Sequence, residues 1–220
     1  MRDFHHDLTE LNYLLQRADV LRRWTRGLAY SVDGATRVEF KAEIAIRADA
    51  HVRPAGTDLE IAEVELNLVV SDDGAITSCS AQVVIDGLAS DGGAVRRFAL
   101  HFDRHPDGQA STELHATYHW QVGGSQLDDM ELGNALFLEG PRFPSHPIDP
   151  VLLVDFVLGH FNGAKRSELL TQHYVRYRRL LHGVQSCFVA PFFAAISAAL
   201  AAENFEPTGL WPALCGPSSP

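Results

Sequence analysis

The stretch VEFKAEIAIRA, residues 38–48, alternates apolar and polar side chains. In an extended chain, one face carries Val38, Phe40, Ala42, Ile44 and Ile46, and the opposite face carries Glu39, Lys41, Glu43 and Arg47. A period of two with one apolar face is typical of a strand that packs on a hydrophobic core and leaves its other side in water. The stretch therefore predicts a sheet with one buried face and one polar face.

The same alternation recurs along the chain up to residue 124. It is found in EVELNLVV at 63–70, in SCSAQVVI at 78–85, and again around 95–105 and 113–122. Turn-forming sequences separate these stretches, namely RPAGTD, SDDGA, SDGGA and HPDGQAS. Short turns between successive strands indicate an antiparallel meander. We therefore expect an α+β fold with an antiparallel meander of about five strands over 36–124.

Helices are expected after the sheet, over 149–203. Asp149 is the predicted N-cap of the first one, and Pro150 takes the first helical position, where its missing N–H is harmless. Asp155 is the one charge inside that apolar helix, so it needs an Arg or His partner. The most apolar stretch, 188–202, is predicted to be a buried core helix.

A helix is also expected before the sheet, over 1–27. Leucines recur at helical spacing, Asp7 is the predicted N-cap, and Gly27 lets the chain turn out of the helix. Helices from both ends would cover the apolar face of the sheet. The prediction is a single α+β domain over 1–206, followed by a proline-rich tail at 207–220.

The composition of the chain disfavours some classes of function and some locations in the cell. The 220 residues carry 28 acidic and 18 basic side chains, a net charge of −10, which argues against a general nucleic-acid binder. Cys79, Cys187 and Cys215 show no metal-binding spacing and suit reduced thiols in a cytoplasm. The N-terminus lacks an apolar signal segment, and the apolar run at 187–202 is shorter than the roughly 20 residues a bilayer needs. We therefore predict a cytoplasmic protein without a membrane partner.

Residues 101–120, HFDRHPDGQASTELHATYHW, form the densest group of chemically active side chains. Both predicted strands of this hairpin have their apolar residues at even positions, so burying both requires a pairing of equal parity. The donors at odd positions then share the polar face, whatever the turn: His101, Asp103, His115 and His119. A turn centred near Gln109 would place Asp103 opposite His115, and His101 opposite Thr117.

Three interpretations of this polar face stay open. The first is a site for a divalent metal, zinc, manganese or iron, with Glu113 as general base and four ligands: His101, Asp103, His115 and His119. The second is a binding face for a small ligand or a protein partner, to which the stiff segment GPRFPSHPIDP adds two side chains: His119, Gln121, Arg142 and His146. The third is an ordinary solvated sheet surface.

The segment from Tyr118 to Phe161 resembles an uncharacterised bacterial protein family. Members pair an HxQxGG strand end with a PRxPxxPxDPVLLxDFVL segment, which here read YHWQVGG and PRFPSHPIDPVLLVDFVL. The resemblance implies no activity; it implies a place among prokaryotic defence or mobile-element genes and points to His119, Gln121, Arg142 and Asp149. It covers under a quarter of the chain, and Trp120 and the insertion at 125–140 depart from the family's spacing.

No Walker, Rossmann, nucleophile-elbow or HExxH pattern occurs in the sequence. The leading prediction is therefore a cytosolic binding or accessory subunit whose polar sheet face engages a protein partner or a small ligand. The alternative is a metal-dependent hydrolase with a His/Asp site on the hairpin at 97–121. A nucleic-acid-binding protein is third, because the net charge of −10 disfavours it.

Overall fold

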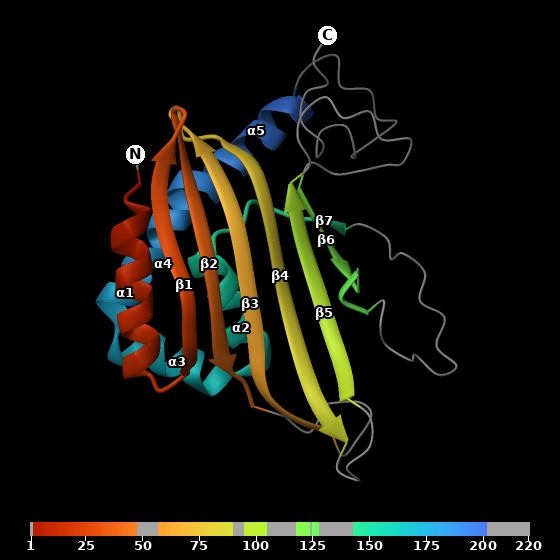
Figure 1. The fold of residues 1–220 in the computed structure, drawn as a ribbon. Helices are drawn as coiled ribbons and strands as arrows, with labels where there is room; N and C mark the ends of the chain where they lie inside the picture. The colour runs from red at the N-terminus through yellow and green to blue at the C-terminus, as the bar shows by residue number, and fades with distance from the viewer. Residues whose placement is uncertain are drawn as a thin grey trace.

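The computed structural model describes residues 2–47, 57–89, 95–104, 118–123, 125–127 and 143–201. In these residues seven strands form one antiparallel sheet in chain order (Figure 1). They are β1 Leu21–Val32, β2 Ala35–Ala45, β3 Thr57–Ser71, β4 Ile76–Ala89, β5 Val95–Arg104, β6 Tyr118–Val122 and the two-residue edge strand β7 Phe143–Pro144. The α+β fold and its antiparallel sheet are confirmed. The described part has more strands than the predicted five.

Helices cover one face of this sheet (Figure 1). They are α1 Phe4–Arg17, α2 Pro150–Phe161, α3 Gly163–Gln172 and α4 Tyr174–Val184. A π-helical turn, η2, at Gln185–Val189 leads from α4 into α5 Ala190–Ala201, which lies outside this layer, and a 3-10 turn, η1, lies at Ser125–Leu127. Leu11, Leu14 and Leu15 of α1 are fully buried, as are Leu153 and Leu158 of α2. The apolar sides of the strands and these helices therefore enclose one core, and α1 to α4 leave the opposite side of the sheet, the outer face, uncovered.

The first helix is shorter than predicted. α1 ends at Arg17, and its cap is Asp3, which accepts a hydrogen bond from the His6 amide at 2.9 Å, rather than Asp7. The predicted helix over 1–27 is therefore wrong in its last third, because residues 21–32 form β1 on the edge of the sheet.

The apolar residues of β1 have the spacing of a helix because the pairing of β1 with β2 is irregular. The register with β2 shifts between Leu21 and Arg23 and again between Trp24 and Arg26, so the inward side chains are spaced by three rather than two. Leu21, Trp24 and Gly27 then face the core, in the spacing of a helical stripe. Gly27 does not end a helix: it lies under the Trp24 indole, and a Cβ there would be 2.4 Å from Trp24 Cζ2.

Two predictions about α2 agree with the structure. Asp149 caps the helix by accepting a hydrogen bond from the Leu152 amide at 2.8 Å, with Pro150 in the first position. Asp155 receives two hydrogen bonds from Arg166, at 2.8 and 3.0 Å, and one from the Tyr177 hydroxyl at 2.9 Å. The charge inside this apolar helix therefore has the arginine partner that its burial requires.

The N-terminus is tied to α2 by an ion pair in the core. Arg2 Nη1 lies 2.6 Å from Asp149 Oδ2, and Arg2 Nε donates to Asp7 at 2.5 Å. Asp149 is fully buried, and the Arg2 side chain is only 7% exposed. The guanidinium also lies over the rings of Phe4 and Phe188, 5.1 and 5.8 Å from their centroids. These contacts join the two ends of the helical layer.

The prediction that 188–202 is a buried core helix is wrong. Pro191 does not stop the helix: the π-helical turn at Gln185–Val189 directly precedes it, and α5 continues to Ala201. Phe188 is buried, but residues 190–198 and 201 of α5 are all exposed or half-buried. The core side of the sheet is already filled by α1, α2 and α4, so α5 leaves the body. By length and composition, Tyr174–Ala198 is the one described helix that could cross a membrane. Only 17% of its most apolar 18-residue stretch is buried inside the protein.

Candidate functional site

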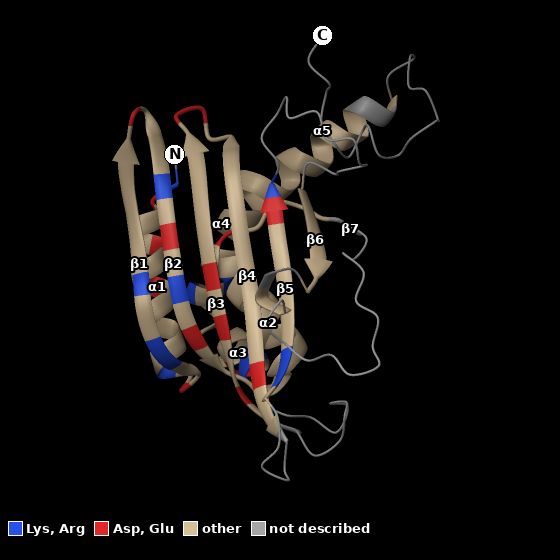
Figure 2. Cartoon of the chain, turned by 45° about the vertical axis from the view of Figure 1, so that its right-hand side comes forward, with Lys and Arg blue, Asp and Glu red and all other residues tan. Residues whose placement is uncertain are grey.

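The outer face of the sheet carries rows of opposite charges over β1 to β5 (Figure 2). Arg26 lies 2.7 Å from Glu39, and Lys41 lies between Glu63 at 2.8 Å and Glu65 at 3.1 Å. Lys41 donates hydrogen bonds to both carboxylates, and these bonds raise its pKa. Most charges on β1–β3 are therefore matched within the sheet, which is the usual state of a solvated sheet surface.

The predicted group of donors on the β5–β6 hairpin lies beside these charges. Asp103 pairs with His119 and His101 pairs with Gln121, so these four side chains share the outer face, as the alternation predicts. The expected register was wrong: Asp103 opposes His119 rather than His115, a shift of four residues along β6. The shift is by an even number of residues, so the facing of each strand is unchanged.

Among the described residues of this group, a histidine and an aspartate lie close to each other. His101 Nδ1 lies 3.9 Å from Asp103 Oδ2, and His101 Nε2 is buried without a hydrogen-bond partner in the described residues. His119 is 2% exposed although it lies on the outer face. Within the described ranges, no three His, Cys, Asp or Glu side chains are placed to hold a metal ion. Two members of the predicted site, Glu113 and His115, lie outside those ranges.

The proline-rich segment brings its histidine next to two members of the predicted group, because His146 lines a small cavity of about 10 Å³ together with Asp103 and His119. β7 pairs with β6 at the edge of the sheet, and His146 follows it on the side of α2. There His146 lines a hollow of about 340 Å³ together with Phe102, Phe156 and His160. Its Nδ1 is 2.8 Å from the Pro147 carbonyl oxygen. Arg142, the other side chain expected from this segment, lies outside the described residues.

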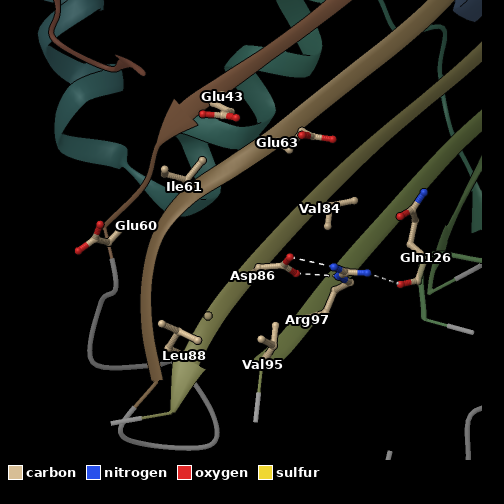
Figure 3. A pocket seen from close by; sticks show the side chains of 11 residues that line it. Glu43, Glu60, Ile61, Glu63, Val84, Asp86, Leu88, Val95, Arg97 and Gln126 are labelled. Atoms are coloured by element: carbon tan, nitrogen blue, oxygen red, sulfur yellow. Dashed lines mark hydrogen bonds and ion pairs between the residues drawn. The ribbon is translucent and has the colours of Figure 1, made fainter. Parts of the chain in front are cut away.

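The larger hollow lies on the outer face, at the end of β3, β4 and β5 (Figure 3). It has a volume of about 690 Å³ and is lined by residues of β2 to β5 and by Gln126 of η1. Four of its side chains are apolar: Ile61, Val84, Leu88 and Val95. Leu88 is 60% exposed and Val95 45%. Exposed apolar side chains grouped inside a polar rim are typical of an interaction site.

The rim of this hollow is mostly acidic. Glu43, Glu60, Glu63 and Asp86 contribute carboxylates, and Arg97 contributes the one positive charge among its lining residues. Arg97 donates to both oxygens of Asp86, at 2.7 and 2.9 Å, and to the Gln126 carbonyl oxygen at 3.0 Å (Figure 3). These bonds fix one wall of the hollow.

The hollow and the histidine group are parts of one surface. On the paired strands β4 and β5, the outward positions run from Asp86 and Arg97, through Val84 and Ala99, to Gln82 and His101. Gln126 donates to Gln82 at 3.0 Å, which joins the 3-10 turn to this column.

Sequence reasoning located the histidine group and missed the hollow. The signal was present in SCSAQVVI, where Val84 puts an apolar side chain on the face that otherwise carries Ser78, Ser80 and Gln82. A single apolar residue on the polar side of a strand is ordinary; it is the grouping of Val84 with Ile61, Leu88 and Val95 that indicates an interaction site.

No protein-family model, no curated protein and no solved structure matches this chain.

Proposed function

We propose that this protein is a cytosolic binding or accessory subunit that holds a peptide segment or small ligand in the hollow on the outer face of its sheet. The observation that carries the proposal is the 690 Å³ hollow with four apolar side chains inside an acidic rim. Its volume lies within the range of about 300–1,000 Å³ found for ligand sites. Assignment to the bacterial family and to a defence or mobile-element system stays a prediction.

The rim defines the chemistry of the ligand. Glu43 is paired with Arg23, Glu63 with Lys41, and Asp86 with Arg97. The four rim carboxylates thus face three cations, and Lys41 is shared with Glu65, so a small excess of negative charge remains at the rim. A ligand with an apolar body and positively charged groups therefore suits the hollow, because its cations compete for the rim while its apolar part covers Leu88 and Val95.

The experiment uses two fluorescein-labelled peptides of alternating sequence, one of lysine and leucine and one of glutamate and leucine. Fluorescence anisotropy should show binding of the basic peptide, weakened by salt, and none of the acidic peptide. Leu88→Arg should weaken binding of the basic peptide at least about tenfold. Leu28→Arg is the matched control, because Leu28 is also on the outer face and is 52% exposed, but lies on β1 outside the hollow. Equal loss in both variants would refute the proposed site.

The second candidate function is a metal-dependent hydrolase on the same face. Two observations favour it. His101 contacts Asp103, and Asp103 lies opposite His119 on the neighbouring strand. In addition, His101 Nε2 is buried and has no hydrogen-bond partner in the described part of the chain. Metal analysis of protein purified without chelators tests it. Binding of less than about a tenth of an equivalent of zinc, manganese or iron would exclude this candidate.

A further inference from the structure

The helix α5 is apolar on every side and lies in contact with water. Its twelve residues, APFFAAISAALA, include one polar side chain, Ser197. Phe193 is 51% exposed, and no α5 residue with described burial is buried. A helix that is apolar around its whole circumference is normally enclosed by a protein core or by lipid. We therefore expect another apolar surface to cover α5 when the protein functions.

The base of α5 is fixed to the domain. Phe188, in the turn just before α5, is buried and stacks on Phe4, with 6.1 Å between ring centroids. Phe192, near the start of α5, packs edge-on against Tyr118 of β6 at 5.3 Å. Beyond these contacts α5 projects past the ends of β3 and β4 (Figure 1). The apolar helix is thus held out from the body in a defined direction.

The charges in the helical stretch that leads into α5 are all basic. From residue 169 to residue 202 the sequence has no Asp or Glu, although the whole chain has 28 of them. The same stretch contains Arg176, Arg178 and Arg179, of which Arg176 is paired with Glu10. Arg178 and Arg179 are exposed, about three turns before α5 begins. Basic side chains next to an uncharged apolar helix match the negative headgroups of a lipid surface.

A lipid surface fits α5 better than another helix does. One partner helix covers a stripe of its neighbour and leaves the other sides in water, so an interface helix carries a polar face. α5 has no such face.

We propose that α5 inserts into one leaflet of an anionic bilayer, with Arg178 and Arg179 facing the headgroups. Twelve helical residues span about 18 Å, which is short of the roughly 30 Å hydrocarbon core, so α5 enters the membrane without crossing it. This reverses the expectation of no membrane partner, which rested on the length of the apolar run and on the lack of an apolar signal segment. It does not depend on the hollow in the outer face and goes beyond the binding function proposed for it.

The test is flotation of the full chain with vesicles of phosphatidylcholine, with and without phosphatidylglycerol. The protein should float with the anionic vesicles. Phe193→Glu should lower the bound fraction at least about tenfold, and replacing Arg178 and Arg179 with Gln should lower the affinity by about fivefold per arginine. Leu28→Glu, at a position equally exposed but on β1, should bind as the unchanged protein does.

Two results would overturn the proposal. One is protein that stays out of both vesicle fractions. The other is vesicle binding that Phe193→Glu leaves unchanged. Light scattering identifies the competing occupant, because a dimer that Phe193→Glu separates into monomers would show that a second copy covers α5.

Discussion

Replacing Arg2 with Met tests whether a buried ion pair holds the N-terminus to α2. Methionine can keep apolar contacts with Phe4 and Phe188 but carries no charge. Asp149 then stays fully buried, with the Leu152 amide at 2.8 Å as its remaining hydrogen-bond donor. Removing one partner of a buried pair costs about 3–5 kcal/mol, out of the 5–15 kcal/mol that is typical for the unfolding of a whole domain.

A second variant separates the charge of Asp149 from its role as a cap. Asp149→Asn keeps an oxygen for the Leu152 amide, and Arg2 keeps Asp7 as a partner at 2.5 Å. We expect a loss of about 1–3 kcal/mol. The double variant leaves no buried charge at position 149, although Asp7 still loses Arg2, so the double variant should be more stable than the sum of the single losses by about 1–3 kcal/mol.

The pH dependence of the Arg2→Met variant has a definite sign. Burial already raises the pKa of Asp149, and Arg2 opposes that shift. Without Arg2 the native state binds a proton at a higher pH than the unfolded chain does. The unfolding free energy of the variant, relative to the unchanged protein, should therefore rise as the pH falls toward the ordinary carboxyl pKa of about 4.

Urea unfolding followed by circular dichroism gives these free energies by linear extrapolation. Arg176→Met is the matched control, because that arginine pairs with Glu10 but is 46% exposed, and its loss should cost less than about 1 kcal/mol. The reasoning is refuted if Arg2→Met costs no more than Arg176→Met, or if the losses of the two single variants simply add.

Two further predictions concern packing and thiols. Gly27→Ala should lower the unfolding free energy by about 1–3 kcal/mol, because the new Cβ would overlap the Trp24 indole. Gly183→Ala, in open space on α4, should raise it by up to about 1 kcal/mol. Urea unfolding measures both, and a Gly27→Ala protein at least as stable as Gly183→Ala would contradict the packing of Trp24 on Gly27. In a Cys215→Ser background, Ellman's reagent should modify the exposed Cys187 in the native protein and reach the buried Cys79 only on unfolding. Burial raises the pKa of Cys79 from 9.0 to about 12, so the unfolded chain releases this proton first. Stability should therefore fall as the pH rises through that window, and a Cys79→Ala variant that shows the same fall would contradict this cause.

The alternation of side chains was sufficient to predict the sheet. In β2 to β5 each strand has one continuous apolar face, so the sequence indicates both the strand and the side that is buried. The same parity placed His101, Asp103 and His119 together, because a strand of fixed facing allows only even shifts of register. The exact partners depend on the length of the turn, and there the prediction for Asp103 failed.

The spacing of apolar residues led to a wrong prediction in β1, where the strand pairing is irregular. Leu21 and Trp24 have the spacing of a helix, and only pairing with β2 shows that two bulges produce it. A bulge adds a residue to one strand but not to its partner, so its evidence lies in the neighbouring strand.

The sequence by itself determined which residues avoid water and, through their period, most of the strands that bury them. The tertiary structure alone decided what covers each apolar surface. The helical segments at 150–161 and 190–201 are both apolar nearly all round, yet α2 fills the core and α5 projects from it. It also decided that Ile61, Val84, Leu88 and Val95, from three strands, form one hollow. Hydrophobicity belongs to a side chain, but burial depends on the space left by every other element, and no single segment carries that information.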